Sequence, residues 1–149
     1  MAYRRTMFER YGLFRTDLGP NERAGSGLGE DSEFGLRLLR EGREIIYCPE
    51  AAVSHPVTSE QLSRPFLIDW HRRYGQSLVE RGQIAGLRSG ETGVPRFMYR
   101  KLVEDIVKWL FTFDRRRRFY NRLALASTLG TFSQLRKRGG DSQCPEGTD

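Results

Sequence analysis

The sequence is poor in the features that define several protein classes. It contains only two cysteines, Cys48 and Cys144, which lie far apart and outside any Cys-x-x-Cys motif. This argues against a disulfide framework and a zinc cluster, and it favours reduced thiols in the cytoplasm. No apolar run approaches the roughly 18 residues that a membrane-spanning helix needs. Residues 1–12 contain no apolar stretch of signal-peptide length.

Lysine is also scarce, so that arginine carries most of the positive charge: three of the 25 basic residues are lysines. The 149-residue chain has a formal net charge of +6, unevenly distributed. Residues 1–95 hold 13 basic and 13 acidic residues, residues 96–138 hold 12 basic and three acidic ones, and residues 139–149 add three acidic ones. A basic segment after a neutral one predicts a surface for nucleic acid, membrane or another acidic ligand.

Apolar periodicity and turn residues divide the chain into predicted elements. The spacing predicts five helices, over residues 3–12, 30–41, 59–82, 96–113 and 115–136. Short β-branched and aromatic runs predict strands at 44–48 and 52–55, each closed by a proline. Glycine-rich segments over 15–29 and 83–95 are expected to be a loop and a linker, and 139–149 a disordered acidic tail.

Two groups of residues are candidates for chemistry. Glu30, Asp31 and Glu33 follow the glycine-rich stretch 25–29 and begin a predicted helix. These acidic residues fit either a helix cap or a positioned general base or Mg²⁺ or Mn²⁺ ligand, and both interpretations remain open. His55, at the end of a predicted strand, is either structural or a metal ligand.

Several short motifs follow one another over residues 1–56. They are Met1-Ala2-Tyr3-Arg4-Arg5, Phe8-Glu9-Arg10-Tyr11-Gly12-Leu13-Phe14, Gly29-Glu30-Asp31-Ser32-Glu33-Phe34, Arg37-Leu38-Leu39 with Gly42, and Ile45-Ile46-Tyr47-Cys48-Pro49-Glu50-Ala51-Ala52-Val53-Ser54-His55. In order and spacing this series resembles the C-terminal half of the catalytic domain of family 2 glycosyltransferases, which have the GT-A fold.

The resemblance implies roles for individual residues. Asp31 matches the catalytic base that deprotonates the acceptor hydroxyl, and Glu30 is its acidic neighbour. Gly25, Gly27 and Gly29 match the loop that lines the substrate site. His55 matches a histidine that helps to bind the divalent metal, Mg²⁺ or Mn²⁺, or the donor diphosphate. A metal cation would assist departure of the nucleoside diphosphate.

The chain departs from that family in what it lacks. It contains no Asp-x-Asp metal motif, and the nucleotide-binding half would precede residue 1. We therefore expect a truncated fragment of a glycosyltransferase acting on a lipid-linked or cell-envelope acceptor, inactive alone and without bound metal or nucleotide-sugar. The expected fold is an α/β fragment with few short strands over 1–58, which exposes a half-sheet through which the chain could oligomerise. A mostly α-helical extension follows: helix and linker over 59–95, then a basic hairpin over 96–138.

The basic hairpin leaves three interpretations open. It is a packing element with solvated cations, a peripheral membrane anchor, or, less favoured, a nucleic-acid surface. In the anchor, aromatic side chains would lie at headgroup level while a run of arginines meets anionic lipid at the inner face of the plasma membrane. The aromatic residues are Trp109, Phe111, Phe113 and Tyr120, and the arginines are Arg115, Arg116, Arg117 and Arg118. The alternative to an enzyme fragment is thus a non-catalytic module that associates with membranes or proteins.

Overall fold

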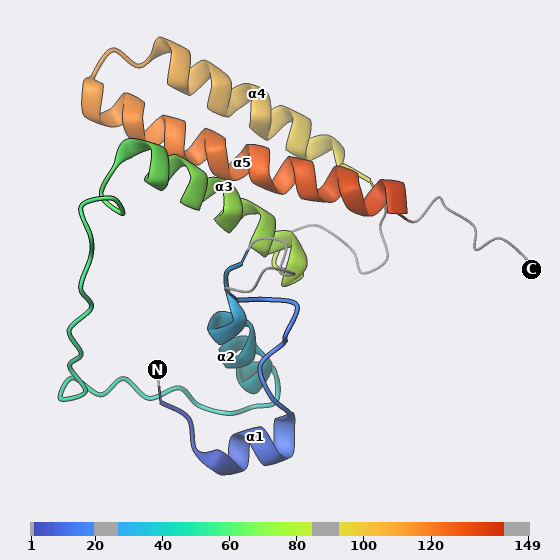
Figure 1. Cartoon of the computed structure of the whole chain (residues 1–149). Coiled ribbons are helices and arrows are strands. Elements are labelled where there is room, and N and C mark those ends of the chain that lie inside the picture. The colour runs from blue at the N-terminus through green and yellow to red at the C-terminus, as the bar shows by residue number, and fades with distance from the viewer. Residues whose placement is uncertain (1, 20–26, 85–92, 142–149) are drawn as a thin grey trace, which may run out of the picture.

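The computed structural model describes residues 2–19, 27–84 and 93–141, and every regular element within them is an α-helix (Figure 1). There are five such helices: α1 (Arg5–Tyr11), α2 (Glu30–Arg40), α3 (Arg64–Glu80), α4 (Arg96–Phe111) and α5 (Arg115–Asp141). The described part of the chain is therefore all-α. The expectation of an α/β fragment was wrong.

The residues expected to form strands remain unpaired. Neither 44–48 nor 52–55 forms a strand, and all of these residues are exposed. β-Branched and aromatic residues favour a pleated, half-buried position, but a strand is stable only when another strand pairs with it. A GT-A domain is built around a β-sheet, so the absence of any sheet from the described residues contradicts the resemblance to family 2 glycosyltransferases.

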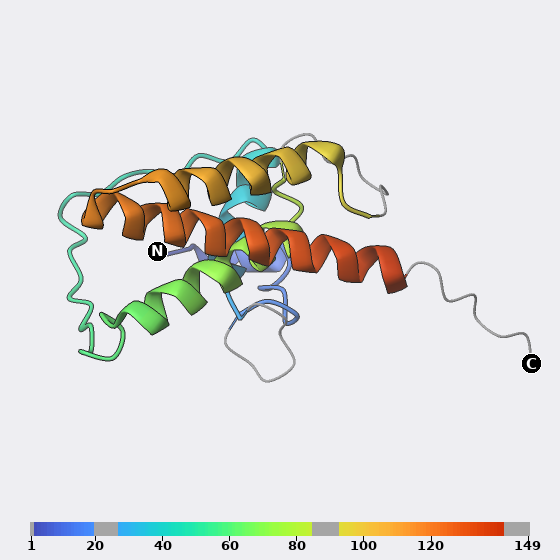
Figure 2. The same cartoon turned by 90° about the horizontal axis from the view of Figure 1, so that it is seen from above.

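The last three helices form a layered unit. α5 lies between α3 and α4 and contacts both, as two views at right angles show (Figures 1 and 2). Where α3 and α5 cross, both helices carry glycine: a methyl group built on Gly75 would lie 1.9 Å from the Ser127 carbonyl oxygen, and one on Gly130 would lie 1.9 Å from that of Arg72. The two backbones are thus in contact. Near one end of the unit is an apolar core of Val79, Met98 and Leu135, with Ile84, Val94 and Phe132 packed against it.

Polar side chains also bridge these helices. Thr131 donates a hydrogen bond of 2.9 Å to the Gly75 carbonyl, which joins α5 to α3. Thr128 on α5 donates one of 2.6 Å to the buried Asp105 carboxylate on α4, which Lys101 also contacts at 3.1 Å. Each buried polar group named here has a partner, as burial requires.

The N-terminal helices meet through aromatic rings. Tyr3, Phe8 and Phe14 surround the fully buried Phe34 of α2, with ring centroids 4.9–5.2 Å from it. The Arg37 guanidinium fastens the chain after α1 to α2 by donating to the carbonyl oxygens of Tyr11 and Leu13. A small aromatic core therefore organises residues 3–40.

The N-terminal part reaches the helical layer at the end of α3. Arg15 donates a hydrogen bond of 3.2 Å to the Glu80 carbonyl. The Arg81 side chain lies so close to Gly29 that a methyl group on that glycine would be 2.8 Å from Arg81 Cδ. Gly29 also has a φ of +98°, which favours glycine, so this junction restricts position 29 twice.

Candidate functional site

The acidic pair predicted as catalytic lies at the start of α2. Asp31 is exposed, and its Oδ1 accepts hydrogen bonds from the backbone amide and hydroxyl of Ser32, at 2.6 and 3.2 Å. Glu30 lies beside Gly19, where a methyl group would be 3.1 Å from Glu30 Cδ. The carboxylates thus begin a helix, where they interact favourably with its dipole. The catalytic role of Asp31, with Glu30 as its acidic neighbour, stays a prediction.

The other residues of the predicted catalytic site lie partly beside this pair and partly in another segment. Gly27 and Gly29 precede α2 with positive φ values, whereas Gly25 lies outside the described residues. His55 is exposed in the irregular segment after residue 50. Among the residues that the structure describes, no group of three His, Cys, Asp or Glu side chains could hold a metal ion. The predicted metal role of His55 therefore has no ligand set around it there.

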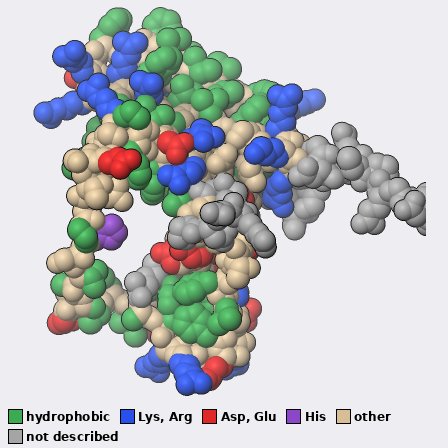
Figure 3. Space-filling model, viewed as in Figure 1, with side chains coloured by type: hydrophobic (Ala, Val, Ile, Leu, Met, Phe, Trp, Pro, Cys, Tyr) green, Lys and Arg blue, Asp and Glu red, His purple; other side chains and the backbone are tan. Residues whose placement is uncertain are grey.

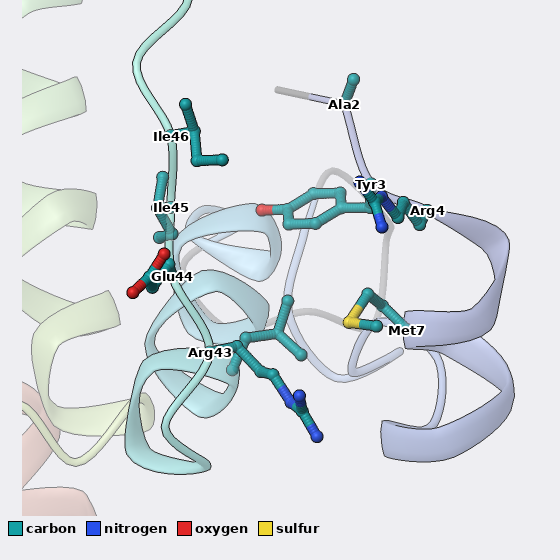
Figure 4. A pocket seen from close by; sticks show the side chains of 9 residues that line it. Ala2, Tyr3, Arg4, Met7, Arg43, Glu44, Ile45 and Ile46 are labelled. Atoms are coloured by element: carbon teal, nitrogen blue, oxygen red, sulfur yellow. The ribbon is translucent and has the colours of Figure 1, made fainter.

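A hollow of about 470 Å³ separates the N-terminal segment from the chain that follows α2 (Figure 4). Its walls mix apolar and polar surface: Tyr3, Met7, Leu38, Ile45 and Ile46 line it together with Ala2, Arg4, Arg43 and Glu44. The Tyr3 hydroxyl donates to the Asp31 carbonyl at 3.2 Å, and burial followed by the nearby Asp31 charge raises the pKa of Tyr3. The Asp31 carboxylate is not part of the lining, so the hollow is separate from the predicted catalytic pair.

The other distinctive surface is the outer side of α4. Its apolar residues recur at alternating intervals of four and three residues and leave large fractions exposed: Tyr99 53%, Val103 60%, Ile106 37%, Leu110 50% and, just beyond the helix, Phe113 93%. The neighbouring series, which begins at Met98 and Leu102, faces α5 instead. α4 thus carries two adjacent apolar stripes. α5 covers the stripe of Met98, and in the other stripe it contacts the Tyr99 ring through Phe132, with ring centroids 5.1 Å apart.

The turn between α4 and α5 presents further apolar side chains. Phe111 is 71% exposed, and it ends α4 next to Phe113. Asn121 secures this turn from α5, donating to Thr112 Oγ1 at 2.8 Å and to the Lys108 carbonyl at 3.1 Å. The two phenyl rings therefore project from a turn that hydrogen bonds hold in place. We call Tyr99, Val103, Ile106, Leu110, Phe111 and Phe113 the α4 apolar face.

Basic side chains follow directly at the start of α5. Arg115, Arg116, Arg117 and Arg118 are all exposed; we call them the arginine cluster. Asp114 caps the helix by accepting a 2.8 Å bond from the Arg117 amide. The Arg118 guanidinium lies 5.7 Å from the Trp109 ring centroid. The space-filling view shows Lys and Arg side chains gathered around this end of the helical layer, next to a broad hydrophobic area along α4 (Figure 3).

The sequence located part of this surface and missed part of it. The cluster and Phe113 were predicted from the charge run and the aromatic residues. Trp109 was expected at the surface but is only half-exposed, beneath Arg118. The outward direction of Val103 and Ile106 was missed, because helical spacing alone does not distinguish these two residues from Met98. The signal was present in the width of the apolar pattern, which exceeds what one neighbouring helix can cover.

No protein-family model, curated protein or solved structure matches this chain. In the described residues, no helix combines the length and apolar character needed to cross a bilayer. The surface of α4 and α5 must therefore be interpreted from its own chemistry.

Proposed function

We propose that the chain is a non-catalytic module that binds the surface of anionic membranes, with the α4 apolar face and the arginine cluster as its contact surface. One observation carries the proposal: Phe111 and Phe113 are 71% and 93% exposed and directly precede four exposed arginines. Apolar side chains that enter the headgroup boundary beside cations that meet lipid phosphates are typical of peripheral binding. The cytoplasmic leaflet carries the anionic lipids that such a surface requires.

The magnitudes support this assignment. Removing apolar surface from water contributes about 25 cal/mol for each Å², and the two phenylalanines alone offer most of their side-chain area. A basic residue close to an anionic bilayer contributes about 1 kcal/mol. The apolar and electrostatic contributions come from adjacent residues, so one bound orientation satisfies both.

The position of the arginines is a second argument. The first turn of α5 contains four arginines and no acidic residue. A helix N-terminus carries partial positive charge, so cations there repel it and one another. Lipid phosphates at this end would interact favourably with both the guanidinium groups and the helix dipole. In the free chain the Asp114 carboxylate, which caps this helix, offsets part of the repulsion. An anionic surface would offset more of it.

Vesicle flotation tests the electrostatic half of the proposal. The chain is expected to float with vesicles of phosphatidylcholine and phosphatidylserine at low salt and to dissociate as salt rises, because screening weakens exposed charges. Replacing all four residues of the arginine cluster by Gln should abolish flotation. A matched control replaces four exposed arginines elsewhere, Arg4, Arg5, Arg10 and Arg40, which lowers the net charge equally. Equal loss in both variants would show that net charge alone is responsible and would refute the assigned surface.

The apolar half has its own variant pair. Phe111→Ser with Phe113→Ser should weaken vesicle binding about tenfold or more, since each ring has large apolar area to bury. Val53→Ser with Val57→Ser removes two exposed apolar side chains from the irregular segment and should leave binding unchanged. In a Trp70→Phe background, tryptophan fluorescence reports the same event, because the remaining Trp109 lies beneath Arg118. Salt-sensitive binding to duplex DNA without vesicle binding would instead assign the cluster to nucleic acid.

A further inference from the structure

The segment that follows α2 is strand-like but has no partner strand. In the described part of the chain, the backbone of residues 44–48 takes part in one backbone hydrogen bond, from the Ala51 amide to the Cys48 carbonyl at 3.2 Å. The segment runs as an extended trace along the hollow near the N-terminus (Figure 4). The N–H and C=O groups of residues 44–47 are therefore available to another chain.

The side chains of this segment are those of a buried strand. Ile45, Ile46 and Tyr47 are 53%, 80% and 87% exposed. β-Branched and aromatic residues are enriched in strands because they pack well on a pleated, half-buried surface. Gly42 and Pro49 limit the run at either end, so that the strand-forming stretch is short and well defined.

We infer that residues 44–48 pair antiparallel with the same residues of a second copy of this chain, with Ile46 at the twofold axis. In that register Ile46 faces its counterpart, Ile45 faces Tyr47 of the second copy, and Glu44 faces Cys48. Apolar residues then meet apolar residues at the three central positions. This inference concerns a surface separate from the α4 apolar face and does not depend on lipid binding.

The register centred on Ile46 is more favourable than the registers centred on the residues to either side of it. A twofold axis perpendicular to the ribbon keeps each side chain on its own face of the ribbon. The strands can therefore slip only by two residues at a time, which moves the axis to the next residue, Ile45 or Tyr47. Centring the ribbon on Tyr47 places Glu44 opposite Glu50, and like charges directly opposite are destabilising. It also places Pro49 opposite Ile45, where proline cannot donate to the ladder. Centring the ribbon on Ile45 places Glu44 opposite Ile46. The sequence is thus self-complementary about Ile46.

The hollow beside residues 44–48 also favours a second copy of this chain as the partner. Ile45 points toward α2, where a methyl group on Gly35 would lie 3.7 Å from Ile45 Cδ1, and it borders the hollow of about 470 Å³ with Tyr3 and Met7. In the proposed pair, Tyr47 of the second copy lies on the same face as Ile45. Its ring would then lie at the edge of this hollow, which Ile46 also borders. Main-chain pairing and ring burial act together, which supplies the packing that a two-stranded ribbon alone would lack.

The oligomeric state in the absence of lipid tests the pairing. Sedimentation of the full chain should show a monomer–dimer equilibrium, and infrared spectra should gain a β-sheet component as dimer forms. Ile46→Lys places two cations opposite each other and should weaken the dimer about tenfold or more. Val53→Lys, at a 90% exposed position of the same irregular segment, is the matched control. A chain that stays monomeric at every concentration, or a dimer that Ile46→Lys leaves equally strong, would overturn the inference.

Cross-linking tests the register. In a background with Cys48→Ser and Cys144→Ser, Ile46→Cys should form a disulfide-linked dimer readily, because residues opposite each other have the closest Cβ atoms. Val53→Cys in the same background should cross-link far more slowly, and equal rates would refute the register. The variant with glutamine in place of the arginine cluster should keep the dimer. A failure of membrane binding can thus be distinguished from a failure of pairing.

Discussion

Helices α3 and α5 cross with their backbones in contact at Gly75 and Gly130. By contrast, α1 and α2 meet through side chains: aromatic rings around Phe34, and Arg37, which donates to the Tyr11 carbonyl. Where two backbones touch, the distance between the helices is fixed, because no side chain lies between them that could change its rotamer. Ring packing accepts small shifts, since T-shaped and offset arrangements have similar energies. The first region is therefore a rigid support for the α4 apolar face. The second is a loosely built end that carries the unpaired segment.

Removing the central ring should give the largest effect and should reveal whether the two regions unfold separately. Phe34 is fully buried and contacts the other three rings, so Phe34→Ala is expected to destabilise the N-terminal part by about 3–5 kcal/mol. Hydrogen exchange should show α2 losing protection while α3 and α5 keep theirs. Equal loss of protection in α5 would mean that the molecule unfolds as one unit.

The glycine crossing should be nearly as sensitive to an added methyl group. The Cβ of Gly75→Ala would lie 1.9 Å from the Ser127 carbonyl oxygen, so the helices would have to move apart. Overpacking of this kind costs about 3 kcal/mol. Urea unfolding followed by circular dichroism measures the change, and a stability within error of the original chain would show that α3 and α5 are not in contact.

The polar link between α4 and α5 should contribute less. Thr128→Val removes the 2.6 Å hydrogen bond to the buried Asp105 carboxylate and leaves it with only Lys101. An under-satisfied buried acceptor costs about 1–3 kcal/mol. Glu104→Gln is the comparison, because it removes an exposed ion pair with Arg100 on the same helix, which contributes about 0.2–1 kcal/mol. Similar values for both variants, from urea unfolding, would show that Asp105 is solvated.

In the N-terminal region, replacing a helical glycine by alanine should be tolerated, unlike the same change at the crossing of α3 and α5. A Cβ on Gly35 would lie 3.6 Å from Tyr3 Oη and 3.7 Å from Ile45 Cδ1, both ordinary contacts. Replacing a glycine inside a helix by alanine then stabilises by about 0.5–1 kcal/mol. In urea unfolding, Gly35→Ala should raise the free energy of unfolding and Gly75→Ala should lower it. This difference would show directly that the two regions differ in how tightly they pack, and a destabilising Gly35→Ala would contradict it.

Helix positions could be predicted because their signals are local. Residues 96–113 were predicted from apolar periodicity, and α4 covers Arg96–Phe111; the prediction over 30–41 corresponds to α2 at Glu30–Arg40. The end of α5 was missed, because Gly139 and Gly140 indicated a tail whereas the helix continues to Asp141. Glycine weakens a helix without always ending it.

Pairing and orientation could not be predicted, because they depend on distant partners. Ile45 and Ile46 carry strong strand propensity, yet no described segment lies beside them as a strand. The arginine cluster was visible as a run of like charges. The sequence did not show which α4 stripe faces α5, because both stripes have helical spacing. Only packing distinguishes Met98 from Val103. Sequence patterns therefore located the basic part of the proposed surface more accurately than its apolar part.

The smallest expected effect is a pH dependence confined to the rigid region. Burial lowers the pKa of His71 on α3, because the surroundings disfavour the charged imidazolium. The unfolded chain then binds more protons than the folded chain near the ordinary histidine pKa of about 6.5. Stability should consequently fall as pH falls through that range, and His71→Gln should flatten the dependence. His55→Gln, which removes the other and exposed histidine, is the control. Because His71 lies on α3, hydrogen exchange should show the effect in α3 and α5 but not in α2; a change centred on α2 would place the titrating group in the other region.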